Sequence, residues 1–223
     1  MSASNAEPLV SIPSGKVVLE GMLELPPNCF AVVVFSHGSG SGRSSPRNRY
    51  VAQELHGAGL GTLLLDLLTT EEDRHYEMRF DIELLTARLC DAVRFVRKHG
   101  ATHSLPVGLF GASTGAASAL RAAAALPGDV SALVSRGGRP DLSGEAVLSL
   151  VRAPTLLIVG GKDHEVIELN QAAYERLRCL KEISIVPGAT HLFEEPGALD
   201  EVAHRAAAWF VQHVPRAQMA SRA

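Results

Sequence analysis

Six short, mostly apolar segments recur along the chain and are separated by stretches with helical spacing. They do not alternate with polar residues, which is typical of parallel strands that helices cover on both faces. The predicted strands are residues 31–35, 62–65, 107–110, 130–134, 155–159 and 183–186. Residues 16–25 do alternate, with Glu20 and Glu24 opposite the apolar positions, and therefore predict a half-exposed antiparallel edge strand.

The segments between the strands carry apolar residues every three or four positions, as amphipathic helices do. Residues 82–96 and 199–210 show this stripe, and residues 116–125 form an alanine-rich run. Alternating strands and helices predict an α/β fold, a doubly wound and mostly parallel sheet with helices on both faces. We expect one domain over residues 1–223, with loose tails at residues 1–7 and 216–223.

Composition limits the classes of function. The chain has 223 residues, 46% of them hydrophobic and 20% charged, which suits a folded domain with a sizeable core. A net charge of −3 argues against a general nucleic-acid or membrane-surface partner. No apolar run is long enough to span a membrane, and the first 16 residues lack a secretory signal. The three cysteines are widely spaced and fit buried thiols in a reducing compartment. We therefore expect a soluble cytoplasmic protein, a monomer or a homodimer.

Candidate catalytic residues directly follow the predicted strands. Ligands of open parallel sheets bind beyond the carboxyl ends of the strands, so these positions matter most. A hydroxyl, Ser113, a carboxylate, Asp163, and an imidazole, His191, each follow a different strand of the predicted sheet. The topology therefore places all three at one edge.

Ser113 is the central residue of a G-x-S-x-G motif. The motif lies between a buried strand and an alanine-rich helix, which is the setting of a nucleophile elbow. Gly111 and Gly115 let the strand and the helix approach without Cβ clashes. The alternative is a glycine-rich turn that contains a serine by chance.

A serine nucleophile needs a base and a group that orients the base. His191 and Asp163 supply them in the chain order Ser…Asp…His that accompanies this elbow. Asp163 has a competing interpretation, because it could cap the helix that starts near Glu165. Asp141, after the preceding strand, is the substitute for the orienting carboxylate.

The glycine-rich stretch after the first parallel strand fits neither common phosphate-binding motif. We expect it to form an oxyanion hole in which the backbone amides of Ser39 and Thr114 hold the substrate oxygen. The alternative is a flexible loop.

Four loop arginines lie on the same edge, and the planar arginine fork suits carboxylate or phosphate groups. The candidates for binding an anionic substrate group are Arg43, Arg47, Arg136 and Arg139. They could instead pair with Asp66, Asp141, Glu194 or Glu195.

At these residues the chain resembles the α/β-hydrolases, and more narrowly the dienelactone hydrolase family of small members without a lid. The resemblance covers residues 16–214 and rests on HGSGSGR at 37–43, GASTGAA at 111–117, VGGKD at 159–163 and GATHLF at 188–193. It implies an α/β-hydrolase fold and a Ser113–Asp163–His191 triad that acts on esters or lactones by acyl transfer. There are two departures. Dienelactone hydrolases use a cysteine where this chain has Ser113, and they carry a glutamate where Ser36 and His37 stand. Both favour a generic serine-esterase mechanism.

The connection over residues 137–154 is too short for a cap domain, so the site should be open to small substrates. The predicted reaction needs no metal and no organic cofactor. The expected partner is a small ester or lactone, which can carry an anionic group. Two other classes stay open. One is a hydrolase fold that has lost catalysis and binds or regulates, and the other is an anion- or nucleotide-binding protein built on the glycine loop.

Overall fold

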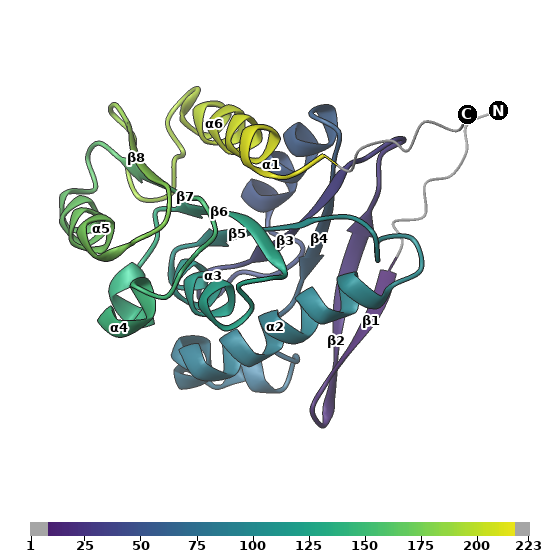
Figure 1. Ribbon diagram of the computed structural model, residues 1–223. Helices are drawn as coiled ribbons and strands as arrows, with labels where there is room; N and C mark the ends of the chain where they lie inside the picture. The colour runs from purple at the N-terminus through teal and green to yellow at the C-terminus, as the bar shows by residue number, and fades with distance from the viewer. Residues whose placement is uncertain (1–8, 217–223) are drawn as a thin grey trace, which may run out of the picture.

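The computed structural model describes residues 9–216. An eight-stranded sheet with the strand order β1-β2-β4-β3-β5-β6-β7-β8 forms its centre (Figure 1). The strands are β1 (Leu9–Ser14), β2 (Val17–Glu24), β3 (Ala31–Ser36), β4 (Leu60–Leu65), β5 (Val107–Ala112), β6 (Val130–Arg136), β7 (Thr155–Gly160) and β8 (Lys181–Val186). The β1–β2 and β2–β4 pairs are antiparallel, and the pairs from β4 to β8 are parallel. Except for Arg216, the predicted loose tails lie outside the described residues.

The mostly parallel sheet predicted from the sequence is confirmed. All six parallel strands form, and each is longer at one end than its apolar run. The antiparallel N-terminal edge also forms, but β2 is its second strand and β1 takes the outermost place. Strand β1, which contains Pro13, was not predicted from the sequence. Proline cannot donate a ladder hydrogen bond, and an outermost strand is where a sheet tolerates it.

Helices cover both faces of the sheet, as predicted. The α-helices are α1 (Pro46–Gly57), α2 (Ile82–Lys98), α3 (Thr114–Ala125), α4 (Glu145–Leu148), α5 (His164–Arg176) and α6 (Ala198–His213), and the 3-10 helices are η1 (Glu72–Arg74), η2 (Tyr76–Phe80) and η3 (Pro140–Ser143). Helices α1 and α6 pack on one face, above the sheet in Figure 1, and α2 and α3 pack on the other. Each face buries its own apolar cluster against the strands.

The sheet reverses its direction of winding between β3 and β5. These strands are neighbours, yet β3 leads into α1 on one face and β5 leads into α3 on the other. In open α/β sheets, ligands bind at the carboxyl edge beside such a switch point. The predicted nucleophile follows β5 and the glycine-rich loop follows β3, so both lie at this switch point.

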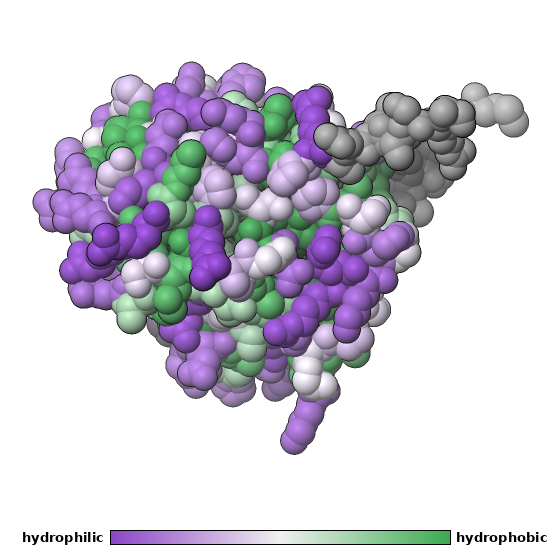
Figure 2. All heavy atoms as spheres, in the orientation of Figure 1, coloured by the Kyte–Doolittle hydropathy of each residue, from purple (hydrophilic) through white to green (hydrophobic). Residues whose placement is uncertain are grey.

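The connection over residues 137–154 holds only η3 and α4, and no cap domain is present in the described part of the chain. At the carboxyl edge of the sheet, the side chain of His191 is partly exposed. Hydrophilic residues dominate the face seen in Figure 2, and hydrophobic residues show there as scattered patches. Within residues 9–216, no helix has the length and apolar character to cross a membrane.

Candidate active site

Ser113 stands at a strained turn between β5 and α3. Its φ is 51° and its ψ is −122°, a region that side chains other than glycine rarely occupy. Such a conformation costs about 1–3 kcal/mol and persists only where the surroundings impose it. Here the Ser113 amide donates to the Arg136 carbonyl over 3.1 Å, and the Ala116 amide donates to the Ser113 carbonyl over 3.0 Å. The fold therefore holds the serine hydroxyl out at the sheet edge, as a nucleophile elbow requires.

Two glycines make this turn possible. A Cβ atom on Gly115 would lie 2.2 Å from the carbonyl oxygen of Ser36, and a Cβ on Gly111 would lie 2.6 Å from the Cα of Ala116. Both obstacles are backbone atoms, so neither can move aside cheaply. The predicted role of the motif glycines, a close approach of strand and helix, is thus observed.

The structure brings Ser113, His191 and Asp163 together. The Ser113 Oγ lies 3.2 Å from His191 Nε2, and His191 Nδ1 lies 2.6 Å from Asp163 Oδ2. An ionised carboxylate only accepts, so His191 Nδ1 carries the proton and Nε2 is left to accept from the serine hydroxyl. The Asp163 side chain is 15% exposed and that of His191 is 37% exposed, so the imidazole reaches solvent while the carboxylate is mostly covered.

The hydrogen-bond partners of Asp163 and Asp141 decide which of the two carboxylates can orient His191. Asp163 occupies the N-cap position of α5, but its side chain makes no capping hydrogen bond and turns to His191 instead. Asp141 is held by Arg139 through two hydrogen bonds of 2.9 and 2.7 Å. Of the two candidates, Asp163 is therefore the one that contacts the histidine.

The His191 loop is anchored from below. Phe193 is buried among the apolar residues beneath α6 and adopts a positive φ of 57°, which turns the chain back after the histidine. The Thr190 amide donates to the Glu195 carboxylate over 3.1 Å. A Cβ on Gly137 would lie 3.5 Å from the His191 ring, so the loop after β6 supports the imidazole from the side.

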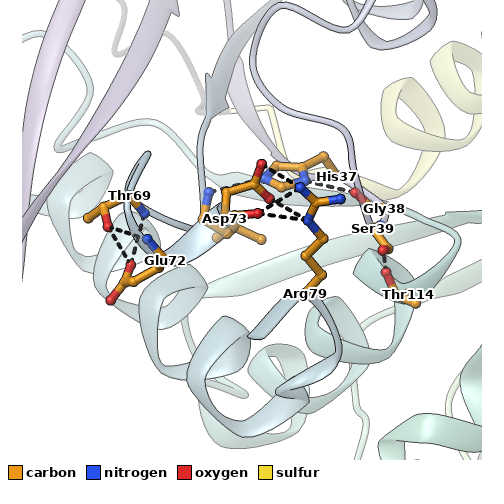
Figure 3. Close-up of polar contacts among 9 residues, drawn as sticks. His37, Gly38, Ser39, Thr69, Glu72, Asp73, Arg79 and Thr114 are labelled. Atoms are coloured by element: carbon orange, nitrogen blue, oxygen red, sulfur yellow. Dashed lines mark hydrogen bonds and ion pairs between the residues drawn. The ribbon is translucent and has the colours of Figure 1, made fainter. Parts of the chain in front are cut away.

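The loop after β3 passes directly beside the nucleophile. A Cβ on Gly38 would lie 3.0 Å from the Cβ of Ser113. The next amide, that of Ser39, donates to Thr114 Oγ1 over 2.9 Å (Figure 3). The two residues predicted for the oxyanion hole are therefore joined, although the Ser39 amide points at the side chain of Thr114. The Thr114 amide opens α3, where the first N–H groups have no intrahelical acceptor.

His37 supports this loop, a role that was not predicted from the sequence. Its Nε2 accepts a hydrogen bond from the Leu67 amide over 3.0 Å, and its Nδ1 lies 3.0 Å from the Gly38 carbonyl. Because an amide can only donate, Nε2 is unprotonated and Nδ1 donates to Gly38. Burial lowers the pKa of His37, which favours this neutral tautomer. A histidine directly after a buried strand, beside glycine, was the available sequence signal.

The segment after β4 is held by Arg88 of α2, a buried side chain. Its guanidinium donates to the Leu67 carbonyl over 2.7 Å and to both oxygens of Glu72 over 2.6 Å. The Arg88 hydrogen bonds lower the pKa of Glu72 to about 2. Glu72 in turn accepts from the Thr69 amide and hydroxyl, and Arg79 pairs with Asp73 nearby (Figure 3).

A cavity of about 530 Å³ lies between this segment and the glycine-rich loop. Hydroxyl, carboxylate and glycine residues dominate its lining, which includes Ser39, Ser41, Asp66, Thr69 and Asp73. Ser39 lines this cavity and is also joined to Thr114 beside the elbow. The size and polarity of the cavity suit one part of a small hydrophilic molecule.

Most of the loop arginines already have carboxylate partners. Arg43 pairs with Asp66 and, over 2.6 Å, with Glu20. Arg47 donates to Glu194 over 2.9 Å through one nitrogen, while its Nε is buried without a partner. The pairing expected as the alternative to substrate binding is thus observed for Arg43, Arg139 and one nitrogen of Arg47.

Arg136 differs from the others. It is 8% exposed, and its guanidinium makes no hydrogen bond or ion pair with any residue in the described part of the chain. Burial, with a smaller effect of the nearby Arg47 charge, lowers the pKa of Arg136 to about 10. The side chain is therefore still cationic at neutral pH, and burying an unpaired charge is costly.

Among residues 9–216, no group of three or more His, Cys, Asp or Glu side chains could hold a metal ion.

A doubly wound sheet with a strained serine after a central strand, contacted by a histidine from a later loop, defines the α/β-hydrolase class of proteins. Comparison with solved structures identifies the family. The chain is 52% identical to a dienelactone hydrolase from Anabaena variabilis, with a TM-score of 0.91, over 94% of this chain and 98% of that one. It therefore belongs to the dienelactone hydrolase family.

Other comparisons are more distant or cover less. Est1E from Butyrivibrio proteoclasticus has a TM-score of 0.78 at 15% identity, over 92% of this chain and 98% of that one, and shows the same fold. A Mycobacterium tuberculosis protein with the provisional name phosphoribosyl transferase is 55% identical over 205 residues, 92% of this chain. The chain spans only 46% of that relative, so its name assigns no activity to the shared part. No family model matches the chain. The similarity to the dienelactone hydrolase supports hydrolase activity.

Proposed function

We propose that the chain is a serine hydrolase that cleaves small carboxylic esters or lactones through an acyl-enzyme on Ser113. The observation that carries this proposal is the unbroken contact from the Ser113 hydroxyl through His191 to Asp163, at 3.2 and 2.6 Å. A serine hydroxyl is a weak nucleophile at neutral pH, and this arrangement supplies both its base and the group that orients the base.

In the first half of the reaction, Ser113 Oγ attacks the carbonyl carbon while its proton passes to His191 Nε2. The carbonyl electron pair moves onto the oxygen, and the oxyanion hole formed by Ser39 and Thr114 holds it. Collapse of this intermediate breaks the ester bond, and His191 returns the proton to the leaving alcohol. Asp163 stabilises the imidazolium and keeps Nδ1 protonated.

In the second half, water takes the place of the alcohol. His191 Nε2 accepts a proton from the water as its oxygen attacks the acyl carbon, and the same oxyanion hole holds the second intermediate. The proton then returns to Ser113 Oγ as the carboxylic acid leaves. For a lactone, the alcohol and the acid are the two ends of one product.

Among the loop arginines, we propose that Arg136 receives an anionic group of the substrate, together with Arg47. The backbone of Arg136 lies beside the elbow, because its carbonyl accepts a hydrogen bond from the Ser113 amide. Its guanidinium and the Arg47 Nε are buried donors without partners in the described structure, which a carboxylate or phosphate would satisfy. Arg43 has no such vacancy, since Asp66 and Glu20 already neutralise it.

A fluorophosphonate probe tests the proposal, because it labels only activated serines. We expect the native chain and a Ser149→Ala control on the exposed end of α4 to be labelled, and Ser113→Ala to stay unlabelled. Hydrolysis of p-nitrophenyl acetate should fall by several orders of magnitude in Ser113→Ala, up to about 10⁶-fold. Equal labelling and turnover of native chain and Ser113→Ala would refute the mechanism. A native chain that neither labels nor turns over would instead be a binding protein with a hydrolase fold.

A further inference from the structure

The Ser39 amide already has an acceptor in the free protein, and that acceptor is Thr114 Oγ1 at 2.9 Å (Figure 3). An oxyanion that accepted directly from the Ser39 N–H would need the same position in front of the nitrogen. The side chain of Thr114 is buried, and among the described residues no acceptor takes its hydroxyl proton. The hydroxyl thus has one lone pair engaged and its O–H free.

The bond belongs to a longer series in which every donor points the same way. The Leu67 amide donates to His37 Nε2, and His37 Nδ1 donates to the carbonyl of Gly38. The Gly38 carbonyl and the Ser39 N–H belong to the same trans peptide group. The N–H therefore points away from the carbonyl and toward Thr114. Hydrogen bonds in series polarise one another, and each strengthens the next donor. The last donor in the series is the Thr114 hydroxyl.

We propose that the Thr114 hydroxyl is a donor in the oxyanion hole, and that the series from His37 through the Gly38–Ser39 peptide polarises it. This deepens the proposed hydrolase function and rests on it. When Ser113 Oγ bonds to the carbonyl carbon, the oxyanion accepts from the Thr114 hydroxyl and from the Thr114 amide. No proton is transferred to the oxyanion, and the Ser39 amide keeps its bond to Thr114 Oγ1 throughout. The contribution of Ser39 therefore reaches the substrate through the threonine side chain.

The competing possibility is that the hydroxyl only fills the hole in the free protein and turns away when substrate arrives. The two possibilities predict opposite effects of Thr114→Val, which replaces the hydroxyl with a methyl group of similar size. If the hydroxyl donates, the methyl group removes the donor and also blocks the Ser39 amide. If the hydroxyl instead turns out of the oxyanion hole when substrate binds, Thr114→Val loses only the hydrogen bond from the Ser39 amide in the free protein. Its kcat then stays level or rises.

The experiment measures kcat and KM for p-nitrophenyl acetate with Thr114→Val, Thr114→Ser and Thr114→Ala, and the affinity of each for a boronic acid that mimics the tetrahedral intermediate. We expect Thr114→Val to lose about 10²–10³-fold in kcat, as other losses of one oxyanion donor do, with little change in KM. Affinity for the boronic acid should fall by a similar factor. Thr114→Ser keeps the hydroxyl and should stay within a few-fold of the native rate. Thr114→Ala should fall between the two, since its smaller side chain opens the Ser39 amide.

Native-like kcat and boronic-acid affinity in Thr114→Val would overturn the proposal. If Thr114→Val does not fold, judged by circular dichroism, a native kcat in Thr114→Ala would overturn it instead. Failure of the hydrolase function itself is separate, because it appears as a native chain that neither labels nor turns over, or as turnover that survives in Ser113→Ala. His37→Leu should lower kcat as well, and should add little to the loss in Thr114→Val, because both act through one series. Independent, multiplying losses would show that His37 acts by another route.

Discussion

Replacing Arg136 with methionine should stabilise the fold while weakening recognition of anionic substrates. Burial lowers the pKa of Arg136 well below the usual range of an arginine, to about 10. At about 1.4 kcal/mol per pKa unit, a shift of this size makes the charged side chain on the order of 3 kcal/mol less favourable in the folded protein than in water. Methionine is similarly long and uncharged, so the variant avoids this cost and loses no hydrogen bond to any described residue.

Part of the gain is offset by imperfect packing of the new side chain, so we expect about 2 kcal/mol of added stability. For a chain of this length, that corresponds to a Tm increase of about 4–8 °C. Thermal unfolding followed by circular dichroism measures it. The matched control is Arg176→Met on α5, where the arginine is exposed and pairs with Glu145 over 2.8 Å. Losing an exposed pair should change stability by less than about 1 kcal/mol.

The same variant is then assayed on a pair of esters that differ only in a carboxylate. The ratio of kcat/KM for the carboxylated ester to that for the neutral ester should fall in Arg136→Met and stay constant in Arg176→Met. A Tm below that of the native chain would mean that the fold already compensates the Arg136 charge. An unchanged ester ratio would refute the anion-binding role, whatever the Tm does.

Two further predictions follow from the turn and from the acid–base properties of the structure. Gly115→Ala should abolish the elbow and lower kcat more than 10²-fold, because its Cβ would lie 2.2 Å from a backbone oxygen, whereas Gly128→Ala has open space and should be neutral. Glu72→Gln should be less stable than the native chain in urea at pH 7, and the gap should close as the pH falls from 4.5 toward 2. The sign follows from a folded pKa below the ordinary value, so that the ionised carboxylate stabilises the fold above pH 4.5 and loses this effect as it is protonated. A gap that persists at pH 2 would show that Glu72 acts through packing instead.

The strand and elbow predictions succeeded because they depend on local pattern. A buried parallel strand must be apolar on both faces, which marks segments such as residues 107–110 without further information. The turn around Ser113 needs glycine on both sides, and this need is also written in the local sequence. The same dependence on local pattern explains why strand β1 was not predicted. Pro13 argues against a strand in the local sequence, and a sheet tolerates it only because β1 lies at the edge.

The partners of charged and buried polar side chains were not predictable in this way. Nothing near Arg43 in the sequence says that Asp66 neutralises it, and nothing near Arg136 says that it has no partner. The same holds for His37. Its sequence neighbours do not show that the Leu67 amide, which follows the neighbouring strand β4, donates a hydrogen bond to it. Such pairings depend on distances between segments that are far apart along the chain.

The order of strands and helices, the position of the nucleophile and the type of its partners therefore follow from the sequence itself, because hydrophobic periodicity and turn chemistry act over a few residues. Which carboxylate contacts His191, where the Ser39 amide points and which arginine stays unpaired are settled only once β3, β5, β6, β7 and β8 pack side by side. Hydrogen bonds and ion pairs form over about 3 Å. Only a folded sheet sets distances that short between residues so far apart along the chain.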